Sequence, residues 1–368
     1  MGTLYDYLSW RGDLSFEQVP LGEVDSLIFA LLSYIDFADL VPGTHDASPI
    51  ALQTVANTFF ARHPDLRKVS MGLIVPHDIL KLFQKVKECK RFRNVRMTAY
   101  VNRINVKEET QFSAITYLLP ANCGTVVAYR GTDDTIIGWK ENFNMSFMPV
   151  VPAQLYATDY LNTAADHTKG ILYVTGHSKG GNLAVYAGVK CRKDVHKRLS
   201  GVWNNDGPGF GGGMLTDPDY LDTKHILHTL VPKSSVVGML LEHDENYTVV
   251  SSRQNGILQH DALSWNVLGG KFVHLKNVSE ESKRTDKTLN TWIRDISPEQ
   301  RAQFSDALYQ ILSSDNAKTL SDLANPRNRW LIRGMQLDPQ VGKIMSKTLT
   351  ALFNENVKEF WERIFPSK

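Results

Sequence analysis

The chain has 368 residues and a formal net charge of +2, and 42% of its residues are hydrophobic and 10% aromatic. This composition excludes a disordered chain and gives no support for nucleic-acid binding, which needs a strongly basic surface. The three cysteines are scattered, and no signal segment or membrane-spanning apolar run is visible, so we expect a cytoplasmic protein without a disulfide framework, metal site or integral membrane segment.

The first 92 residues are predicted to be mainly helical. Apolar residues recur at helical spacing over residues 23–35 and again over residues 77–89. A shorter helix is expected at residues 51–61. The basic run at residues 85–96 is interpreted as a solvated helix end rather than a nucleic-acid patch, because cations complement the dipole at a helix C-terminus.

The pattern changes to that of β-strands near residue 94. Residues 95–101, 111–119 and 124–130 predict a β-meander. Strand and helix patterns then alternate up to residue 275, which favours a parallel sheet covered by helices on both faces. The strands expected in this later part lie at residues 171–175, 200–205, 225–231, 247–251 and 257–260.

The segment 171–187 has the pattern of a nucleophile elbow. Its apolar start predicts a strand, Gly-His-Ser-Lys-Gly follows at residues 176–180, and a helical pattern comes next. The middle residue of such a turn is strained, and its neighbours two before and two after must be glycine to avoid clashes. Ser178 is therefore the predicted nucleophile; the alternative is a glycine-rich turn with a capping serine.

These patterns together predict an α/β fold of the α/β-hydrolase type, with a mostly parallel central sheet flanked by helices. We expect the hydrolase domain at residues 1–275, made of N-terminal helices at 1–92 and a core at 93–275. Residues 276–368 are expected to form a C-terminal helical extension.

The extension contains two helical patterns. Ser297-Pro-Glu-Gln300 has the residues of a capping box with proline at the first helical position, and an apolar stripe follows it. A second stripe runs over residues 341–364. Such stripes are predicted to dock on a core rather than on a membrane.

An acid must follow the nucleophile in this fold. Asp206 comes directly after the strand predicted at residues 200–205, where a Gly-Pro-Gly turn begins. It is the preferred acid, although an aspartate before Gly-Pro is also a common turn residue. Asp244 and Asp261 are the alternatives.

The base must come later still, as a histidine beyond a late strand. His260 ends the apolar run that precedes a polar turn, and it is the preferred base. His243, in the acidic segment 242–245, is the second candidate. The remaining interpretation of His260 is that of a histidine in a surface loop.

Two groups are candidates for binding an oxyanion. The backbone N–H of Lys179 follows the nucleophile, and Thr132, at the end of an early strand after Gly131, offers an N–H and a hydroxyl. The side chain of Lys179 either attracts an anionic substrate or pairs with a carboxylate, and we favour the ion pair.

Two segments resemble the class 3 (fungal-type) triacylglycerol lipases. These are V-V-A-Y-R-G-T at residues 126–132, followed by Trp139, and G-H-S-K-G-G at residues 176–181. The resemblance departs from the class at one place. Class 3 lipases carry their acid after the strand corresponding to residues 225–231, where this chain has no carboxylate, and Asp206 instead resembles the acid of pancreatic-type lipases, one strand earlier.

The sequence is more similar to a bacterial family of lipase-like α/β-hydrolases of unknown function. The shared segments are L-Y-D-Y at residues 4–7, N-D-G-P-G-F at 205–210, and Q-H-D at 259–261 before Trp265. The resemblance covers about residues 1–275. It implies the α/β-hydrolase fold and serine hydrolase chemistry, without an assigned substrate.

The function expected from the residues is carboxylic ester hydrolysis through Ser178, His260 and Asp206, with no metal or cofactor. The expected substrate is a small or lipid-like ester. Residues 236–241 either line an acyl pocket, form part of a lid, or are a core helix. The alternatives are a non-catalytic hydrolase-fold protein that binds a ligand or partner, and a peptidase or acyltransferase with the same triad.

Overall fold

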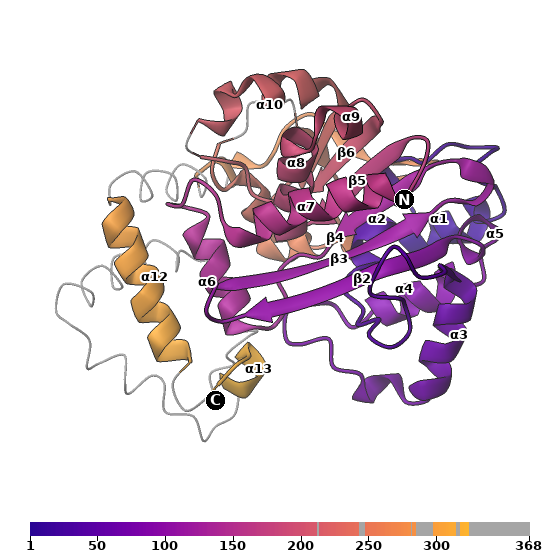
Figure 1. Ribbon diagram of the computed structural model, residues 1–368, viewed down its shortest axis with the longest axis horizontal. Coiled ribbons are helices and arrows are strands. Elements are labelled where there is room, and N and C mark those ends of the chain that lie inside the picture. Colours follow the sequence, from indigo (N-terminus) through magenta and orange to yellow (C-terminus); the bar gives the residue numbers. More distant parts are fainter. Residues whose placement is uncertain (212, 243–246, 281, 285–296, 314–316, 324–368) are drawn as a thin grey trace.

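A nine-stranded sheet forms the centre of the computed structural model, which describes residues 1–211, 213–242, 247–280, 282–284, 297–313 and 317–323 (Figure 1). Its strands, in spatial order, are β1 (Ile50–Ala51), β2 (Arg96–Asn105), β3 (Thr110–Leu118), β4 (Thr125–Tyr129), β5 (Leu172–His177), β6 (Leu199–Asn205), β7 (Leu227–Pro232), β8 (Thr248–Val250) and β11 (His274–Leu275). Between β8 and β11 in the sequence, β9 (Val267–Leu268) and β10 (Lys271–Phe272) pair with each other in a separate two-stranded sheet.

The direction of the strands confirms the α/β-hydrolase fold expected from the sequence. The five central strands β4 to β8 run parallel, and β2, β3 and β4 form the expected antiparallel meander. Strands β1 and β11 pair antiparallel at the two edges. The carboxyl ends of β4, β5 and β6 therefore lie along one end of the sheet, where α/β proteins place their sites.

The helices are α1 (Leu4–Arg11), α2 (Glu23–Leu32), α3 (Leu52–Arg62), α4 (Ile79–Val86), α5 (Lys90–Arg93), α6 (Ile136–Asn144), α7 (Pro152–Asp166), α8 (Lys179–Lys190), α9 (Lys193–His196), α10 (Pro218–Thr223), α12 (Pro298–Leu312) and α13 (Leu320–Leu323). Short 3-10 turns occur at η1 (Leu66–Lys68), η2 (Pro120–Asn122), η3 (Met214–Thr216), η4 (Lys224–Ile226), η5 (Val237–Met239), η6 (Gly256–His260) and η7 (Ala262–Ser264). Within the described residues, no helix is long and apolar enough to cross a membrane.

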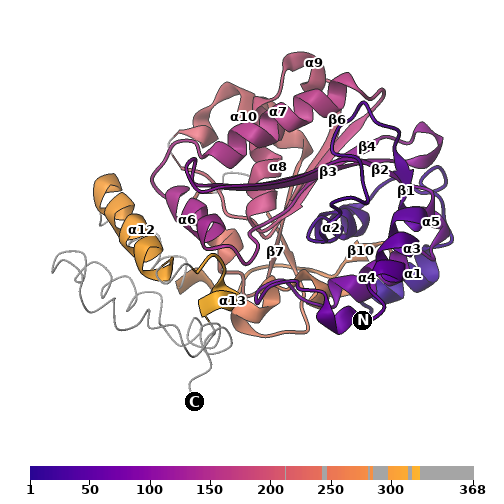
Figure 2. The ribbon, with the colours of Figure 1, turned by 60° about the horizontal axis from the view of Figure 1, so that its bottom comes forward.

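Helices cover both faces of the sheet (Figure 2). Because side chains alternate along a strand, Val127 and Val174 pack toward α7 and α8, while their neighbours Val126 and Tyr173 pack toward α2 and the N-terminal helices. Almost every residue of α2 is buried, which explains its nearly continuous apolar sequence.

The interpretation of residues 85–96 as a solvated helix end is wrong for Arg91. Its guanidinium is fully buried and makes an ion pair of 2.7 Å with Asp25 of α2. It also donates to the carbonyls of Leu14, Ser15 and Val19. A buried cation requires such partners, and the long-range pairing with Asp25 left no periodic signal in the sequence.

Two strand predictions were also wrong. Residues 256–260 form η6 instead of a strand, because β11 already occupies the edge of the sheet beside β8. His225 lies in η4, before β7 begins at Leu227. Its Nδ1 contacts the carbonyl oxygen of Asp222 at 2.7 Å, so the chain is still turning out of α10 at this point.

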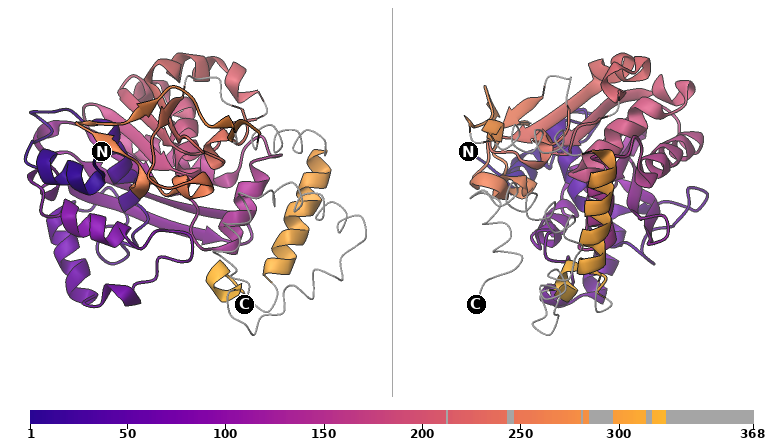
Figure 3. Two further views of the ribbon diagram at one scale, coloured as in Figure 1. Left: turned by 180° about the vertical axis from the view of Figure 1, so that it is seen from behind. Right: turned by 90° about the vertical axis from the view of Figure 1, so that its left-hand side faces the viewer.

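Helix α12 lies against α6 at one end of the molecule (Figure 3). Its predicted capping box is confirmed, since the Ser297 N–H donates to Gln300 Oε1 at 3.0 Å and the Gln300 N–H donates to Ser297 Oγ at 3.2 Å. Phe304 is buried and packs edge-to-face on Phe143 of α6. The second predicted stripe, residues 341–364, lies outside the described residues.

Candidate active site

Ser178 lies in the sharp turn between β5 and α8, as the elbow motif predicts. Its backbone angles, φ 58° and ψ −134°, are outside the regions that L-residues prefer. A Cβ on Gly176 would lie 1.9 Å from the carbonyl oxygen of Gly180, and one on Gly180 would lie 2.2 Å from that of Tyr129. The two glycines therefore allow the close contacts that the turn requires.

Asp206 follows β6 and is fully buried. One carboxylate oxygen, Oδ1, accepts hydrogen bonds from Ser235 Oγ at 2.5 Å and from the Gly238 N–H at 3.1 Å. These two donors hold the carboxylate in place and leave its second oxygen, Oδ2, for another partner.

That partner is His260, the last residue of η6. The Nδ1 atom of His260 lies 2.7 Å from Oδ2 of Asp206. Because an ionised carboxylate only accepts hydrogen bonds, Nδ1 carries the hydrogen and Nε2 keeps a lone pair in the neutral ring. The side chain of His260 is 24% exposed, so solvent reaches the imidazole ring.

The structure brings His260 and Asp206 into contact, and it places His260 beside the residue that precedes Ser178. The rings of His177 and His260 lie 4.7 Å apart. Among the hydrogen bonds of the described residues, none joins Ser178 Oγ to His260. Hydrogen bonds between a nucleophile and its base are often long in structures without a substrate.

Of the alternative residues, the structure describes Asp261. Asp261 accepts a hydrogen bond from the Leu263 N–H at 3.1 Å and so caps the short turn η7. His243 and Asp244 lie outside the described residues.

The two predicted oxyanion residues, Thr132 and Lys179, lie just after β4 and at the start of α8. Gly131 approaches the nucleophile closely, since a Cβ on it would lie 3.1 Å from Ser178 Cβ. The next residue, Thr132, is buried, and its hydroxyl accepts a hydrogen bond from Asn142 Nδ2 at 2.6 Å. A hydroxyl that accepts from Asn142 keeps its own hydrogen for another acceptor.

The backbone and the side chain of Lys179 lie in different surroundings. Its N–H belongs to the first turn of α8, where helix amides have no partner within the helix. Its ammonium is buried and contacts Glu141 at 2.9 Å and two oxygens of Gln111 at 2.6 and 2.8 Å. The ion pair favoured from the sequence is thus confirmed.

Four residues near the site were not identified from the sequence. Ser235 supports Asp206, Asn142 supports Thr132, and Tyr34 and His177 contact each other at 3.0 Å beside the elbow. His177 stands next to the nucleophile in the motif, which is the one local signal that could have indicated it. The others come from distant parts of the chain.

The segment at residues 236–241 is not the core helix that was one interpretation of its apolar sequence. It forms the 3-10 turn η5, and most of its side chains are only partly buried. Its contribution to the site is the N–H of Gly238, which donates to Asp206.

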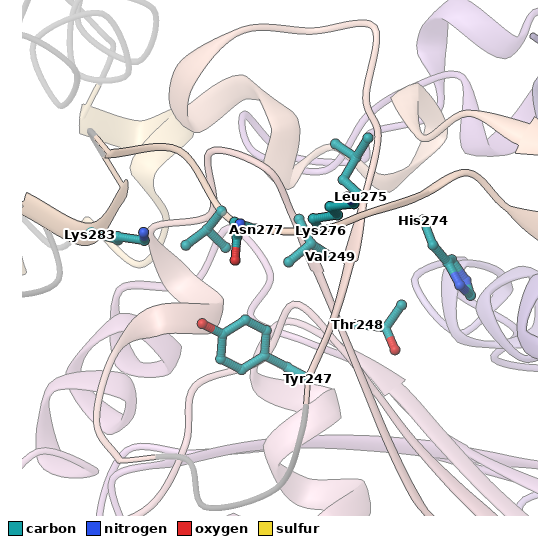
Figure 4. A pocket seen from close by; sticks show the side chains of 9 residues that line it. Tyr247, Thr248, Val249, His274, Leu275, Lys276, Asn277 and Lys283 are labelled. Atoms are coloured by element: carbon teal, nitrogen blue, oxygen red, sulfur yellow. The ribbon is translucent and has the colours of Figure 1, made fainter.

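A cavity of about 530 Å³ lies elsewhere, against β8 and the edge strand β11 (Figure 4). Tyr247, His274 and Lys283 are among its lining residues, and none of the candidate site residues is. Within the described residues, no three histidine, cysteine or acidic side chains are grouped closely enough to hold a metal ion.

Comparison with known proteins gives one family match and two distant structural matches. The family model described as Mbeg1-like matches residues 86–310. The Rhizomucor miehei lipase in its propeptide complex is 16% identical with a TM-score of 0.33, over 43% of this chain and 57% of that chain. The M37 lipase is 13% identical with a TM-score of 0.33, over 91% of this chain and 96% of that chain.

The chain therefore aligns with little more than half the length of the Rhizomucor miehei lipase. Among the curated proteins, none matches this sequence significantly.

Proposed function

Since the chain belongs to the Mbeg1-like family, whose model spans more than half of it, we propose that this member is a serine hydrolase of carboxylic esters. The observation that carries the proposal is the 2.7 Å contact between His260 Nδ1 and the buried carboxylate of Asp206, next to the strained turn that holds Ser178. A histidine oriented by an acid, with a serine hydroxyl within its reach, is the arrangement that activates a serine.

In the first half of the reaction, Ser178 Oγ attacks the carbonyl carbon of the ester. Its proton passes to Nε2 of His260, while Asp206 holds the proton on Nδ1 and stabilises the imidazolium. The tetrahedral intermediate then expels the alcohol, which takes the proton from Nε2. The product of this half is an acyl group bound to Ser178.

The negative charge that develops on the carbonyl oxygen needs donors already in position. We assign this role to the N–H of Lys179, at the start of α8, and to Thr132. Asn142 supports the assignment, because its hydrogen bond to Thr132 Oγ1 leaves the hydroxyl hydrogen directed to another acceptor.

In the second half, a water molecule attacks the acyl carbon. His260 takes the proton of the water and returns it to Ser178 Oγ when the acid leaves. The cycle regenerates the free serine and uses only side chains, backbone amides and water.

A fluorophosphonate probe tests the nucleophile directly, because it forms a covalent bond only with an activated serine. We expect the full-length protein to be labelled and the Ser178→Ala variant to remain unlabelled. The matched control is Ser48→Ala, which removes a hydroxyl exposed to solvent in a loop. A folded wild-type protein that takes up no label, or a label that persists in Ser178→Ala, would contradict the proposal.

The second candidate function is binding of a ligand or partner without catalysis. The observation in its favour is that the described structure has no hydrogen bond between Ser178 and His260. Turnover of short p-nitrophenyl esters that disappears in Ser178→Ala would exclude it. A peptidase or an acyltransferase would use the same residues, and analysis of the products separates them from an esterase.

We further propose a small-molecule or lipid-like ester as substrate and the cytoplasm as the place of action. The cytoplasmic location is supported by three free cysteines, Cys89, Cys123 and Cys191, which a reducing compartment tolerates. The relation to class 3 lipases is supported by the two motifs around Thr132 and Ser178.

A further inference from the structure

We propose that His177 is a positioning residue, which holds the main chain of His260 against the elbow while Tyr34 fixes the orientation of its ring. The inference rests on the proposed function, because it concerns the placement of the base in that reaction. It adds two residues that do not touch the reacting atoms.

The directions of the hydrogen bonds follow from the acceptor at one end. His177 Nε2 lies 3.0 Å from the carbonyl oxygen of His260, which can only accept, so Nε2 carries the hydrogen. In the neutral ring Nδ1 is then the acceptor, and the hydroxyl of Tyr34, 3.0 Å away, donates to it. Gly131 packs closely against this hydroxyl, since a Cβ on it would lie 2.1 Å from the Tyr34 oxygen.

These contacts join segments of the sequence that have different roles in the proposed reaction. Gly131 precedes the oxyanion residue Thr132, His177 precedes the nucleophile, and His260 is the base. Tyr34 comes from the segment just after α2, 143 residues before His177. A shift of any one of these parts is therefore transmitted to the others.

The position of His260 in the chain explains why a contact to its main chain matters. Residues 253–255, which lead into η6, are exposed, and η6 is a single short turn. The Ser234 N–H donates to the side-chain Oε1 of Gln259 and the Trp265 indole donates to the Gln259 carbonyl, so both contacts hold the residue before His260. The contact from His177 holds the carbonyl of His260 itself, on the side of the elbow.

Burial keeps the ring of His177 uncharged. Only 6% of the residue is exposed, and burial together with the neighbouring His260 holds its pKa well below 6.5. A neutral ring adds no repulsion when His260 becomes an imidazolium during the reaction.

Two substitutions separate the two contacts of the ring. In His177→Gln the amide nitrogen lies near the position of Nε2 and still donates to the His260 carbonyl. In His177→Asn the shorter amide lies near the position of Nδ1, so it keeps a partner for Tyr34 and cannot reach His260. We expect kcat for p-nitrophenyl esters to fall about 10²-fold in His177→Asn, with KM changed less than about twofold, because misplacing a catalytic group mainly slows chemistry.

In His177→Gln we expect kcat within about fivefold of the wild-type value, because the anchor to the base is restored. Tyr34→Phe removes one hydroxyl and is expected to lower kcat about threefold in the wild type. The loss should be smaller in His177→Gln, where the ring acceptor is absent and only the main-chain carbonyl of residue 177, 3.4 Å from the hydroxyl, still accepts from it. The rate of fluorophosphonate labelling of Ser178 should follow the same order. Thermal unfolding of each variant checks that it is folded.

Equal losses in His177→Asn and His177→Gln, or no loss in either, would overturn the inference, and so would a loss seen in KM alone. A wild-type protein that is neither labelled nor active would instead overturn the proposed function. If neither His177 variant folds, the kcat values of Tyr34→Phe, Ser235→Ala and the double variant test the inference instead. Independent supports of the base predict additive losses in kcat, whereas no effect of Tyr34→Phe contradicts the inference.

Discussion

Two buried carboxylates near the elbow differ in what they support. Asp206 is held by Ser235 and Gly238 and presents its free oxygen to His260. Glu141 instead accepts hydrogen bonds from Thr110 and from the N–H groups of Gln111 and Ala153, and it pairs with Lys179. The charge of Lys179 is therefore paired inside the protein with the charge of Glu141.

Replacing Asp206 tests the role of the acid at the scale of one residue. In Asp206→Asn the amide can stabilise the wrong tautomer of His260, so kcat is expected to fall about 10³- to 10⁴-fold with the fold retained. Ester hydrolysis and fluorophosphonate labelling measure this loss.

The control for this variant is Asp261→Asn, which changes the neighbouring acid that caps η7. We expect it to keep kcat within about threefold of the wild type, because asparagine caps about as well as aspartate and the tautomer of His260 is not affected. A larger loss in Asp261→Asn than in Asp206→Asn would show that the acid has been assigned to the wrong residue.

At the scale of elements, α12 depends on α6 for its attachment. Phe304 packs on Phe143, Ser305 donates to Asn144 at 2.9 Å, and Asp306 pairs with Lys140 at 2.7 Å. Helix α6 also carries Asn142, the residue that contacts Thr132. Helix α12 thus packs on the element that carries Asn142.

Truncating the aromatic contact should loosen α12 and leave the sheet intact. Phe304→Ala removes a side chain that is only 2% exposed, a change that typically costs about 3 kcal/mol. If α12 opens locally, its amide hydrogens should exchange up to about 10²-fold faster, while those of β5 and β6 keep their rates. Gln310→Ala, on the exposed face of α12, is the control, and equal exchange in both variants would contradict this packing.

At the scale of the whole molecule, the parallel sheet collects residues that are far apart in sequence. The ends of β4, β5 and β6 supply Thr132, Ser178 and Asp206, and the loop beyond β8 supplies His260. The N-terminal helices cover the face of the sheet that contains Tyr173 and Trp203, and the segment after α2 brings Tyr34 to the same end.

The buried, neutral His177 makes the stability of the fold depend on pH. Because the pKa of His177 is well below 6.5 in the folded protein, the unfolded chain binds a proton near pH 6.5 that the folded chain does not. This contribution to stability is complete above pH 6.5 and is lost as the pH falls toward the folded pKa. We therefore expect the free energy of unfolding to fall between pH 7.5 and 5, in part through this one group.

Urea unfolding at the two pH values measures the effect. The free energy of unfolding should fall less between pH 7.5 and 5 in His177→Gln than in the wild type, because glutamine does not titrate. The same fall in both proteins would mean that other groups carry the acid sensitivity.

The local parts of this structure follow from the sequence by itself. Gly176 and Gly180 indicate the elbow because only glycine permits the backbone contacts of that turn, and Ser297 with Gln300 indicates the start of α12 because capping depends on residues three apart. The position of Asp206 after β6 likewise needs only the order of the elements in the fold.

Other features were decided by the tertiary structure alone. Residues 256–260 became a turn because β11 occupies the sheet edge, Arg91 became buried because Asp25 faces it, and His177 met Tyr34 across 143 residues. The physical reason is the range of the interactions. Sterics and capping act between neighbours in the chain and leave a readable pattern, whereas a buried polar contact depends on which distant segment the packed sheet and helices bring alongside.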